Sequence, residues 1–479
     1  MIISSRAQRA SLAATAGMML AFSQLSGALA ISPMPSAPSL TVGPNVDVSG
    51  FADNEAETTV AVNPLNPNNV VVVSNFQTAD ALMESVSFDG GTTWSARMIA
   101  DGSDELGVAC CDPNAAFDQY GNYFLVYLDQ RAKKVQVAYS TNGGVTMRFL
   151  ATVDHTDQSN PQANGKKWGA GSDQPSLATG PGGTWFVYKM FGTGGQLLQV
   201  RGLPVSGLGQ FGALSPTQLV PGSKYGSFGD IAVGPNGQVL TSYQDNIPTQ
   251  GPSTIFSNLD PDGFGPAAFG AARVATSTNV GGFDFIPPQA SRSVDAEIGL
   301  AYDRSGGSHR GRVYLLYTDE QPNESNNTDI WVRRSDDNGA TWSAPIRVND
   351  DAGTNSQFNP HIAIDQATGI VAVGFHDARN DLGTRGAGDT NGIPNDDAQY
   401  FAAVSRDAGA TFSANVRVSA GTSNAAASHN GVQYGDYTGL GFAGGVIHPA
   451  WADNSNSAGG NPDGALGRFD VYSAAVTVH

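Results

Sequence analysis

The chain has 479 residues, with 25 Lys and Arg against 43 Asp and Glu, and a formal net charge of −18. This excess of acid argues against nucleic acids and membrane surfaces as partners, because both are bound largely through Lys and Arg. Charged residues make up only 14% of the chain and there are 59 glycines, which favours an all-β fold with many tight turns over a helical one.

The N-terminus has the pattern of an export signal. Arg6 and Arg9 give it a basic start, and residues 10–22 are apolar but too short to span a bilayer. Ala28-Leu29-Ala30 fits a cleavage site, so we expect a secreted protein, extracellular or periplasmic. The expected divisions are a signal peptide, a flexible Pro/Ser-rich lead and one domain, over residues 1–30, 31–44 and 45–479.

The two cysteines, Cys110 and Cys111, are neighbours in the chain. Export favours oxidation. However, neighbouring Cα atoms lie about 3.8 Å apart, below the roughly 4.4–6.8 Å usual for a disulfide. A vicinal disulfide and a pair of free thiols both remain open from the sequence.

A nine-residue pattern, S-x-D-x-G-x-T-W-S, recurs along the chain. Its copies begin at Ser87, Ser140, Ser335 and Ser405. The second copy is worn, with Asn142 in place of Asp and Met147 in place of Trp. In such a turn the Ser and Asp side chains bond backbone groups, Gly permits positive φ, and the aromatic ring packs between neighbouring units. We therefore expect these residues to be structural.

A second repeat, an apolar pair at the start of each unit, gives the number of units. Its copies are Val60-Ala61, Ala115-Ala116, Leu177-Ala178, Ile231-Ala232, Leu300-Ala301, Ile362-Ala363 and Leu440-Gly441. Seven units predict a seven-bladed β-propeller, and a six-bladed ring with one inserted unit is the alternative. The last unit ends after a third strand at 470–478. Residues 45–48 resemble its missing outer strand, so we expect this N-terminal strand to close the ring.

Acidic residues stand where the inner strands begin. These positions carry Glu57, Asp112, Asp173, Asp230, Glu297, Asn359 and Asp436. In a four-stranded blade these starts lie on the face opposite the turn between strands three and four, so the acids should ring the mouth of the central channel. Crowded carboxylates raise one another's pKa or bind a cation, and separated pKa values suit acid/base glycoside hydrolysis. A solvated rim of turn-capping Asp residues is the alternative.

Two further groups are candidates for binding. Asp129 and Asp377, at the ends of second strands, each have an Arg two residues on, Arg131 and Arg379. Such Arg residues are candidate anion contacts, as is Arg292. The residues we expect to bind substrate are therefore Arg379, Arg131, Asp377, Glu57 and Asp436.

The insertion after Asp377 contains Asp389-Thr390-Asn391-Gly392, which is similar to part of a calcium loop. It lacks the full set of ligands over twelve residues with a closing Glu. Asp389 and Asn391 are thus candidate ligands for calcium, the one cofactor suggested, and a plain loop is the alternative.

Taken together, the four turns resemble the Asp boxes, or BNR repeats, of sialidase-like β-propellers. The resemblance implies a secreted, glycan-processing glycoside hydrolase similar to exo-sialidases, acting on an extracellular glycan or glycoconjugate. Sialidases use a Tyr nucleophile paired with Glu and an Asp acid/base, and the positions similar to these are Tyr437, Glu297 and Asp112. The family's first-blade Phe-Arg-Ile-Pro motif is absent, and Glu57 occupies its place, so the arginine triad for sialic acid is not matched.

Two other functions remain open from the sequence. One is a non-catalytic propeller that binds a glycan, a protein or a cation on the same face, because a fold does not by itself specify a function. The other is a lyase on uronic-acid polymers, working with a cation in the acidic mouth. In each case we expect a monomer.

Overall fold

The structure is a computed structural model that describes residues 39–153, 171–191, 197–245 and 248–479; the expected signal peptide lies outside them. The described chain forms seven antiparallel sheets of four to six strands. The first three blades comprise β3 (Glu55–Val62), β4 (Val70–Phe76), β5 (Ala81–Ser87) and β6 (Ser95–Ile99); β7 (Ala109–Phe117), β8 (Tyr123–Asp129), β9 (Val135–Ser140) and β10 (Arg148–Val153); and β11 (Ser172–Gly180), β12 (Gly183–Met190), β13 (Gln199–Gly207), β14 (Gln210–Phe211) and β15 (Gln218–Leu219).

The next three blades follow in chain order. They comprise β16 (Ser227–Val233), β17 (Val239–Gln244), β18 (Ser253–Asp260) and β19 (Arg273–Thr278); β20 (Gly299–Tyr302), β21 (Val313–Glu320), β22 (Thr328–Ser335) and β23 (Ile346–Arg347); and β24 (Gln357–Ile364), β25 (Val371–Asp377), β26 (Asp397–Ser405), β27 (Val416–Arg417) and β28 (Ser423–Asn424). The seventh comprises β29 (Gly439–Ala443), β30 (Val446–Asp453), β31 (Asp470–Ser473), β32 (Val476–Val478), β1 (Leu40–Val42) and β2 (Val46–Asp47). Two short 3-10 helices are η1 (Ser223–Tyr225) and η2 (Pro287–Gln289).

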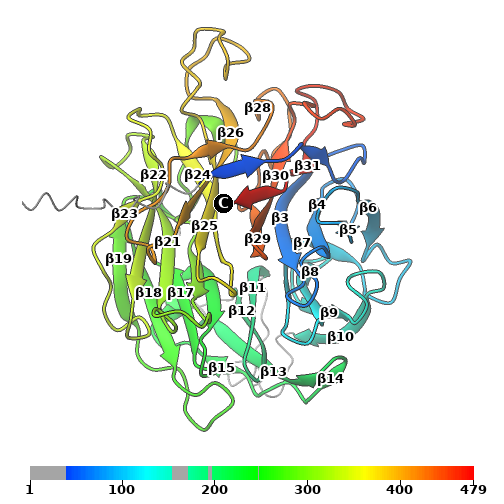
Figure 1. Cartoon of the computed structure of the whole chain (residues 1–479), viewed down its shortest axis with the longest axis vertical. Coiled ribbons are helices and arrows are strands. Elements are labelled where there is room, and N and C mark those ends of the chain that lie inside the picture. The colour runs from blue at the N-terminus through cyan, green and yellow to red at the C-terminus, as the bar shows by residue number, and fades with distance from the viewer. Residues whose placement is uncertain (1–38, 154–170, 192–196, 246–247) are drawn as a thin grey trace, which may run out of the picture. The chain divides into compact units, whose positions relative to one another are not determined.

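The inner strands form a closed ring. Each packs beside the next, from β3 to β7, β11, β16, β20, β24 and β29, and β29 returns to β3 (Figure 1). The prediction of a seven-bladed propeller is therefore confirmed, and the six-bladed alternative is wrong. No helix in the described part of the chain is long and apolar enough to cross a membrane.

The N-terminal strand closes the last blade, as predicted. Val46 lies opposite Ser473 of β31, and the Val48 amide donates to the Val471 carbonyl at 2.8 Å. A second strand, β1, pairs with β32, Leu40 opposite Val478. Strand pairing thus begins at Leu40, within the segment expected to be a flexible lead.

The four S-x-[DN]-x-G turns each join the third strand of a blade to the fourth. In the copies of blades 1, 5 and 6, the carboxylates of Asp89, Asp337 and Asp407 accept the amide of the Thr four residues on, at 2.8–2.9 Å. In the worn copy Asn142 accepts the Thr146 amide at 3.0 Å. These side chains therefore serve the turns.

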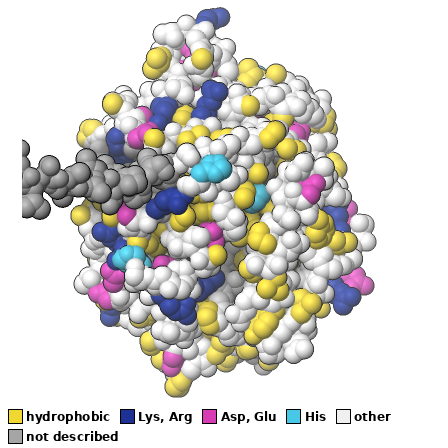
Figure 2. Space-filling view, viewed as in Figure 1, with side chains coloured by type: hydrophobic (Ala, Val, Ile, Leu, Met, Phe, Trp, Pro, Cys, Tyr) yellow, Lys and Arg dark blue, Asp and Glu magenta, His cyan; other side chains and the backbone are white. Residues whose placement is uncertain are grey.

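Adjacent blades are held together by apolar side chains between them and by polar side chains near the axis. Trp185 and Trp451 are among the largest fully buried groups. Nearer the axis, a polar residue of one inner strand accepts a backbone amide of the next: Thr59 from Ala115 at 3.1 Å, Asn114 from Leu177 at 3.2 Å, and Asp230 from Leu300 at 2.7 Å. The face seen in Figure 2 carries acidic and basic side chains interspersed, with apolar side chains between them.

Candidate active site

The site is built by one backbone irregularity that recurs at the start of six inner strands. The residue three positions before the apolar pair has a positive φ in each: Glu57, Asp112, Gln174, Phe228, Glu297 and Asn359, with φ between 37° and 58°. The strand pairing shifts register at the same place in blades 1, 2, 3, 4 and 6, as a β-bulge does. Bulges re-aim side chains, and here they bring acids from several blades together at the mouth.

The carboxyl groups of Asp112 and Asp173 lie next to each other. Asp112 is 7% exposed, and burial together with the neighbouring Asp173 raises its pKa well above the ordinary value. Burial, followed by the charge of Asp436, raises the pKa of Asp173 to about 6, while its hydrogen bond with Asp112 lowers it. The Gln174 amide donates to Asp112 at 2.9 Å. Because two neighbouring carboxylates repel each other, the pair releases its two protons at separate pH values.

A single guanidinium joins two other acids of the mouth. Arg292 donates through Nε to Asp436 Oδ1 at 2.6 Å and through Nη2 to Asp436 Oδ2. The same Nη2 donates to Glu57 Oε1 at 3.0 Å. Burial by itself would lower the pKa of Arg292, but its hydrogen bonds and the charges of Asp436 and Glu57 outweigh burial and raise it. The guanidinium of Arg292 is therefore already paired with two protein carboxylates.

Asn75, from the second strand of blade 1, connects these two groups of acids. Its amide nitrogen donates to Glu57 Oε2, and its carbonyl accepts the Asp112 backbone amide at 2.9 Å. Burial, then Asp436 and Asp112, raises the pKa of Glu57 well above the ordinary value. The positions of Glu57 and Asp112 are therefore fixed by one shared side chain.

Glu297 lies on the other side of the mouth, next to Asp295. Its own backbone amide donates to Asp295 at 2.6 Å. Burial, then the charges of Asp295 and Asp436, raises the pKa of Glu297 well above its ordinary value. Burial also raises the pKa of Asp295 to about 8. The Glu297 carboxyl group therefore holds its proton more tightly than an exposed Glu does.

Tyr437 stands between these acids. Its hydroxyl donates to the Pro113 carbonyl at 3.4 Å. Burial raises its pKa well above 10, and the charges of Asp112, Glu57, Asp436 and Glu297 raise it further. The phenol therefore remains protonated, and its oxygen can still accept a hydrogen bond from a ligand in the mouth.

A long loop between β19 and β20 covers part of the mouth. It supplies Phe283, Phe285, Arg292 and Asp295. The loop is fixed to the last blade, because the Arg292 amide donates to the Gln433 side chain at 2.9 Å. It thus brings aromatic rings and a cation over acids that come from other blades.

Two connected hollows result. The outer one has a volume of about 350 Å³ and is lined by Asp173, Gln174, Phe228, Phe283, Phe285, Arg292, Asp295 and Asp436, among others. The inner one, of about 70 Å³, is lined by Glu297, Tyr437, Asp230 and Asn114, among others. Gln174, Phe228 and Asp295 belong to both linings. A ligand in the outer hollow would meet aromatic rings on one side and carboxyl groups on the other.

The structure places two of the expected substrate-binding residues elsewhere. Arg379 donates to Asp377 at 2.7 Å and to Asp350 at 2.6 Å, and its guanidinium lies 4.5 Å from the centre of the Phe401 ring. Asp377, at the end of β25, is buried and bonded to Arg379 and Gln357. These groups join the outer parts of blades 5 and 6.

The third such residue, Arg131, is exposed in the turn after β8. Near the start of the same blade's first strand, β7, Cys110 and Cys111 form a vicinal disulfide directly before Asp112.

The expected calcium ligands are also away from the mouth. They lie in the loop between β25 and β26, which projects beyond the blades at the top of Figure 1. Asp389 caps a turn by accepting the Gly392 amide at 2.6 Å, and Asn391 donates to Asp396 at 2.8 Å. The carboxylates that do gather here are Asp381, Asp396 and Asp397, whose oxygens lie within 4.8 Å of one another.

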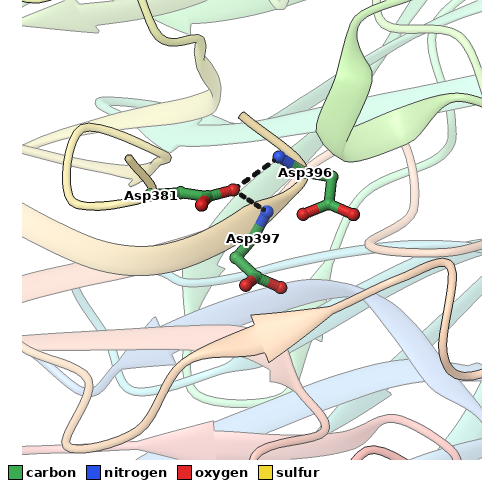
Figure 3. Close-up of side chains that lie close together, drawn as sticks. All are labelled: Asp381, Asp396 and Asp397. Atoms are coloured by element: carbon green, nitrogen blue, oxygen red, sulfur yellow. Dashed lines mark hydrogen bonds between the residues drawn. The ribbon is translucent and has the colours of Figure 1, made fainter. Parts of the chain in front are cut away.

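Most of this loop cluster is already compensated by hydrogen-bond donors. Asp381 accepts the backbone amides of Asp396 at 2.7 Å and Asp397 at 3.0 Å, as Figure 3 shows. Asp397 accepts the Thr390 hydroxyl at 2.8 Å and the Asn424 side chain at 2.6 Å. These bonds explain how the loop keeps its conformation without requiring an ion.

Replacing Arg292 by Met should destabilise the fold. Glu57 is 2% exposed and would lose its cation together with Asp436, so we expect the free energy of unfolding to fall by roughly 2–4 kcal/mol at pH 7. The lower part of that range allows for Arg292, which is 32% exposed. Urea unfolding measures the change. Arg131→Met, at an exposed position, is the control and should stay within about 0.5 kcal/mol; equal effects of the two would contradict the role given to Arg292.

The chain matches no protein-family model and no curated protein. Solved structures similar to it include a *Penicillium chrysogenum* α-L-arabinanase (13% identity, 91% of this chain and 98% of that chain, TM-score 0.44). They also include a *Dyadobacter fermentans* protein of unknown function (11%, 92% and 99%, 0.48). A third is a *Trypanosoma rangeli* sialidase (11%, 89% and 55%, 0.39). What this chain does must therefore be decided from the mouth itself.

Proposed function

We propose that this chain is a secreted glycoside hydrolase that cleaves neutral glycans at the mouth of the propeller. One observation carries the proposal: Glu297 and Asp173, two carboxyl groups whose pKa burial raises, line two adjacent hollows of about 70 and 350 Å³, and Tyr437 lines the same hollow as Glu297. Hydrolysis of a glycosidic bond needs one protonated and one ionised carboxyl group. We assign the protonated role to Glu297 and the ionised role to the Asp112–Asp173 pair.

The roles follow from the protonation states. Glu297 donates its proton to the glycosidic oxygen as the bond from that oxygen to the anomeric carbon breaks. A water oxygen bonds to the anomeric carbon, and its proton passes to the ionised member of the Asp112–Asp173 pair. A second proton transfer through solvent then restores Glu297.

The resemblance to sialidases implies a nucleophilic role for Tyr437, but its surroundings favour another. Four carboxyl groups around the ring raise the pKa of Tyr437, which opposes the tyrosinate that a nucleophile requires. We assign its hydroxyl to a hydrogen bond with the substrate. Glu57 and Asp436 hold Arg292 and the floor of the mouth.

The choice of a neutral sugar follows from charge and shape. Arg292 is the only cation that lines either hollow in the described part of the chain, and Asp436 and Glu57 occupy it. A mouth this acidic would repel sialic or uronic acids. The rings of Phe228, Phe283 and Phe285 offer an apolar wall for the C–H face of a sugar.

The test is a screen of released sugars. The purified protein is incubated with neutral, sialylated and uronic-acid oligosaccharides, and products are separated by chromatography. We expect release from a neutral glycan alone, reduced by Tyr437→Phe mainly through KM. Release of sialic acid, or unsaturated products from a uronic-acid polymer, would contradict the proposal. Binding of a neutral glycan without any release would instead make the mouth a binding site.

A further inference from the structure

A second group of acids lies where the ring closes. Asp47 comes from the N-terminal strand β2, Glu55 from the inner strand β3 of blade 1, and Asp470 from β31 of blade 7. Two more acids, Asp53 and Asp463, act on this group from nearby. The three strands are thus joined through carboxyl groups at the seam between the two ends of the chain.

The carboxyl oxygens of this seam lack donors. Glu55 and Asp470 are both 0% exposed, and neither has a hydrogen-bond partner for either oxygen among the described residues; Oδ2 of Asp47 has none either. The Ser49 hydroxyl lies close enough to lower the pKa of Glu55, but it donates to Asp47 Oδ1 at 3.3 Å. The carboxyl of Asp470 faces that of Asp47, and burial followed by this contact raises its pKa to about 10. Five buried oxygens therefore lack a compensating proton donor or cation.

Blade 5 shows how a buried acid at the equivalent position can be compensated. In blade 5, Trp331 lies opposite Arg347, and Arg347 pairs with Asp329, two residues before Trp331, at 3.3 Å. In blade 7, Tyr472 lies opposite Asp47, and Asp470 is two residues before Tyr472. The position that Arg347 occupies in blade 5, beside Asp329, is therefore occupied at the seam by Asp47, beside Asp470.

Blade 1 also pairs a buried acid of its third strand with an Arg of its fourth strand, in a different register. Its buried Glu84, on the third strand, lies opposite Arg97 on the fourth, and the two form an ion pair. The seam differs from both blades. Asp47 stands where an Arg would pair with the buried acid, and a third acid, Glu55, is added.

We propose that Asp47, Glu55 and Asp470 bind a divalent cation, preferentially Ca²⁺, which fastens the N-terminal strand to the last blade and closes the ring. Three carboxylates on separate strands offer only oxygen ligands, which suits a hard cation. Their oxygens do not all lie within 4.8 Å of one another in the structure, so the ion would draw the three side chains together. Ca²⁺ tolerates irregular coordination better than Mg²⁺ does, and the exposed Asp463 and half-buried Asp53 mark the side from which an ion enters. The site is independent of the mouth and of its proposed activity.

The experiment compares thermal unfolding of the full-length protein in EGTA, in CaCl₂ and in MgCl₂. We expect millimolar Ca²⁺ to raise Tm by about 3 °C or more, and Mg²⁺ to raise it less. Hydrogen exchange followed by mass spectrometry locates the effect. The amides of Gly43 and Val48, which donate to Ala475 and Val471 across the seam, should exchange more slowly with Ca²⁺ bound.

Variants separate this site from any other. Asp470→Asn with Glu55→Gln removes two charges without changing shape, so it should raise Tm in EGTA and abolish both the Tm response and the protection at the seam. Asp329→Asn, at the equivalent position of blade 5, and Asp396→Asn, in the loop cluster, should both keep the Ca²⁺ response. A Tm of the unaltered protein that is indifferent to Ca²⁺, or a response that survives in the double variant, would overturn the proposal. Stabilisation by acidification alone, without any Ca²⁺ response, would show that the acids are held protonated instead.

Discussion

Replacing Glu297 by Gln is expected to lower kcat on a neutral glycan by about 10²–10⁴-fold, with little change in KM. The amide has the shape of the protonated carboxyl group but cannot give a proton to the leaving oxygen. The loss should depend on the leaving group: an aryl glycoside, which departs without protonation, should be affected much less than a natural oligosaccharide. Steady-state rates on both substrates measure the difference.

A matched control exists in blade 1. Glu84 is fully buried, and burial raises its pKa to about 7, as burial raises that of Glu297. It pairs with Arg97 on the fourth strand, well away from the mouth. Glu84→Gln should therefore lower stability and leave kcat unchanged. If Glu297→Gln slowed both substrates equally, the proton would have to come from another group.

The fold was predictable because it is repetitive. The apolar pairs recur once per blade, and the S-x-D-x-G turns mark the third connection of blades 1, 2, 5 and 6. Each copy supports the interpretation of the others. The sequence of the last unit lacks an outer strand, which led to the prediction that an N-terminal strand closes the ring. The pairing of Val46 with Ser473 agrees with that prediction.

The mouth was predictable only where it follows the same repeat. Glu57, Asp112 and Glu297 stand three residues before the apolar pair and have the positive φ that aims them inward. The same spacing selects Gln174 and Phe228 instead of Asp173 and Asp230, so choosing acids by type alone missed an amide and a ring that line the hollows. Applying the spacing strictly would have found both.

The loop between β19 and β20 lies outside the repeats, so no periodicity in the sequence predicts its conformation. Asp295 and the aromatic wall of Phe283 and Phe285 were therefore missed, and Arg292 was noted only as one Arg among several. Asp377 and Arg379 illustrate the opposite error. Their spacing suggested a binding pair, but two neighbouring, oppositely charged residues satisfy each other first, and here they do so at 2.7 Å.

The same residue type serves two purposes in this chain, and solvation separates them. Asp89, in an exposed turn, accepts the Thr93 hydroxyl and amide, which lower its pKa to about 2. Asp295, at the mouth, is buried, and its pKa rises to about 8. A turn carboxylate such as Asp89 is thus ionised throughout the physiological pH range. A buried carboxyl group such as Asp295 changes its charge within that range.

The buried carboxyl groups predict an unusual dependence of stability on pH. Burial raises the pKa of Glu84 and Asp284 to about 7 and that of Asp295 to about 8, against about 4 in the unfolded chain. An acid whose pKa rises on folding holds its proton more tightly in the folded state. Its contribution to stability is therefore complete at low pH and is lost as pH rises through the folded-state pKa.

Three buried histidines act in the opposite direction, but over a lower range. Burial lowers the pKa of His361 and His448 to about 4 and that of His376 to about 3, against about 6.5 unfolded. Because their folded-state pKa is depressed, protonation of the unfolded chain removes stability as pH falls below about 6.5. Above that pH they contribute nothing further to the slope.

Above pH 6.5, where the histidines no longer contribute, the free energy of unfolding should therefore fall by on the order of 2–3 kcal/mol by about pH 8.5. Urea unfolding at pH 6.5, 7.5 and 8.5, with EGTA present throughout, measures the slope. Asp295→Asn removes one titrating group and should flatten it, whereas Asp89→Asn, which changes a carboxylate already ionised at every one of these pH values, should shift the curve without changing its slope. A stability that stays level or rises from pH 6.5 to 8.5 would mean that the buried acids are charged in the folded protein, with cations or water compensating them, and the protonated Glu297 on which the proposed reaction depends would lose its physical basis.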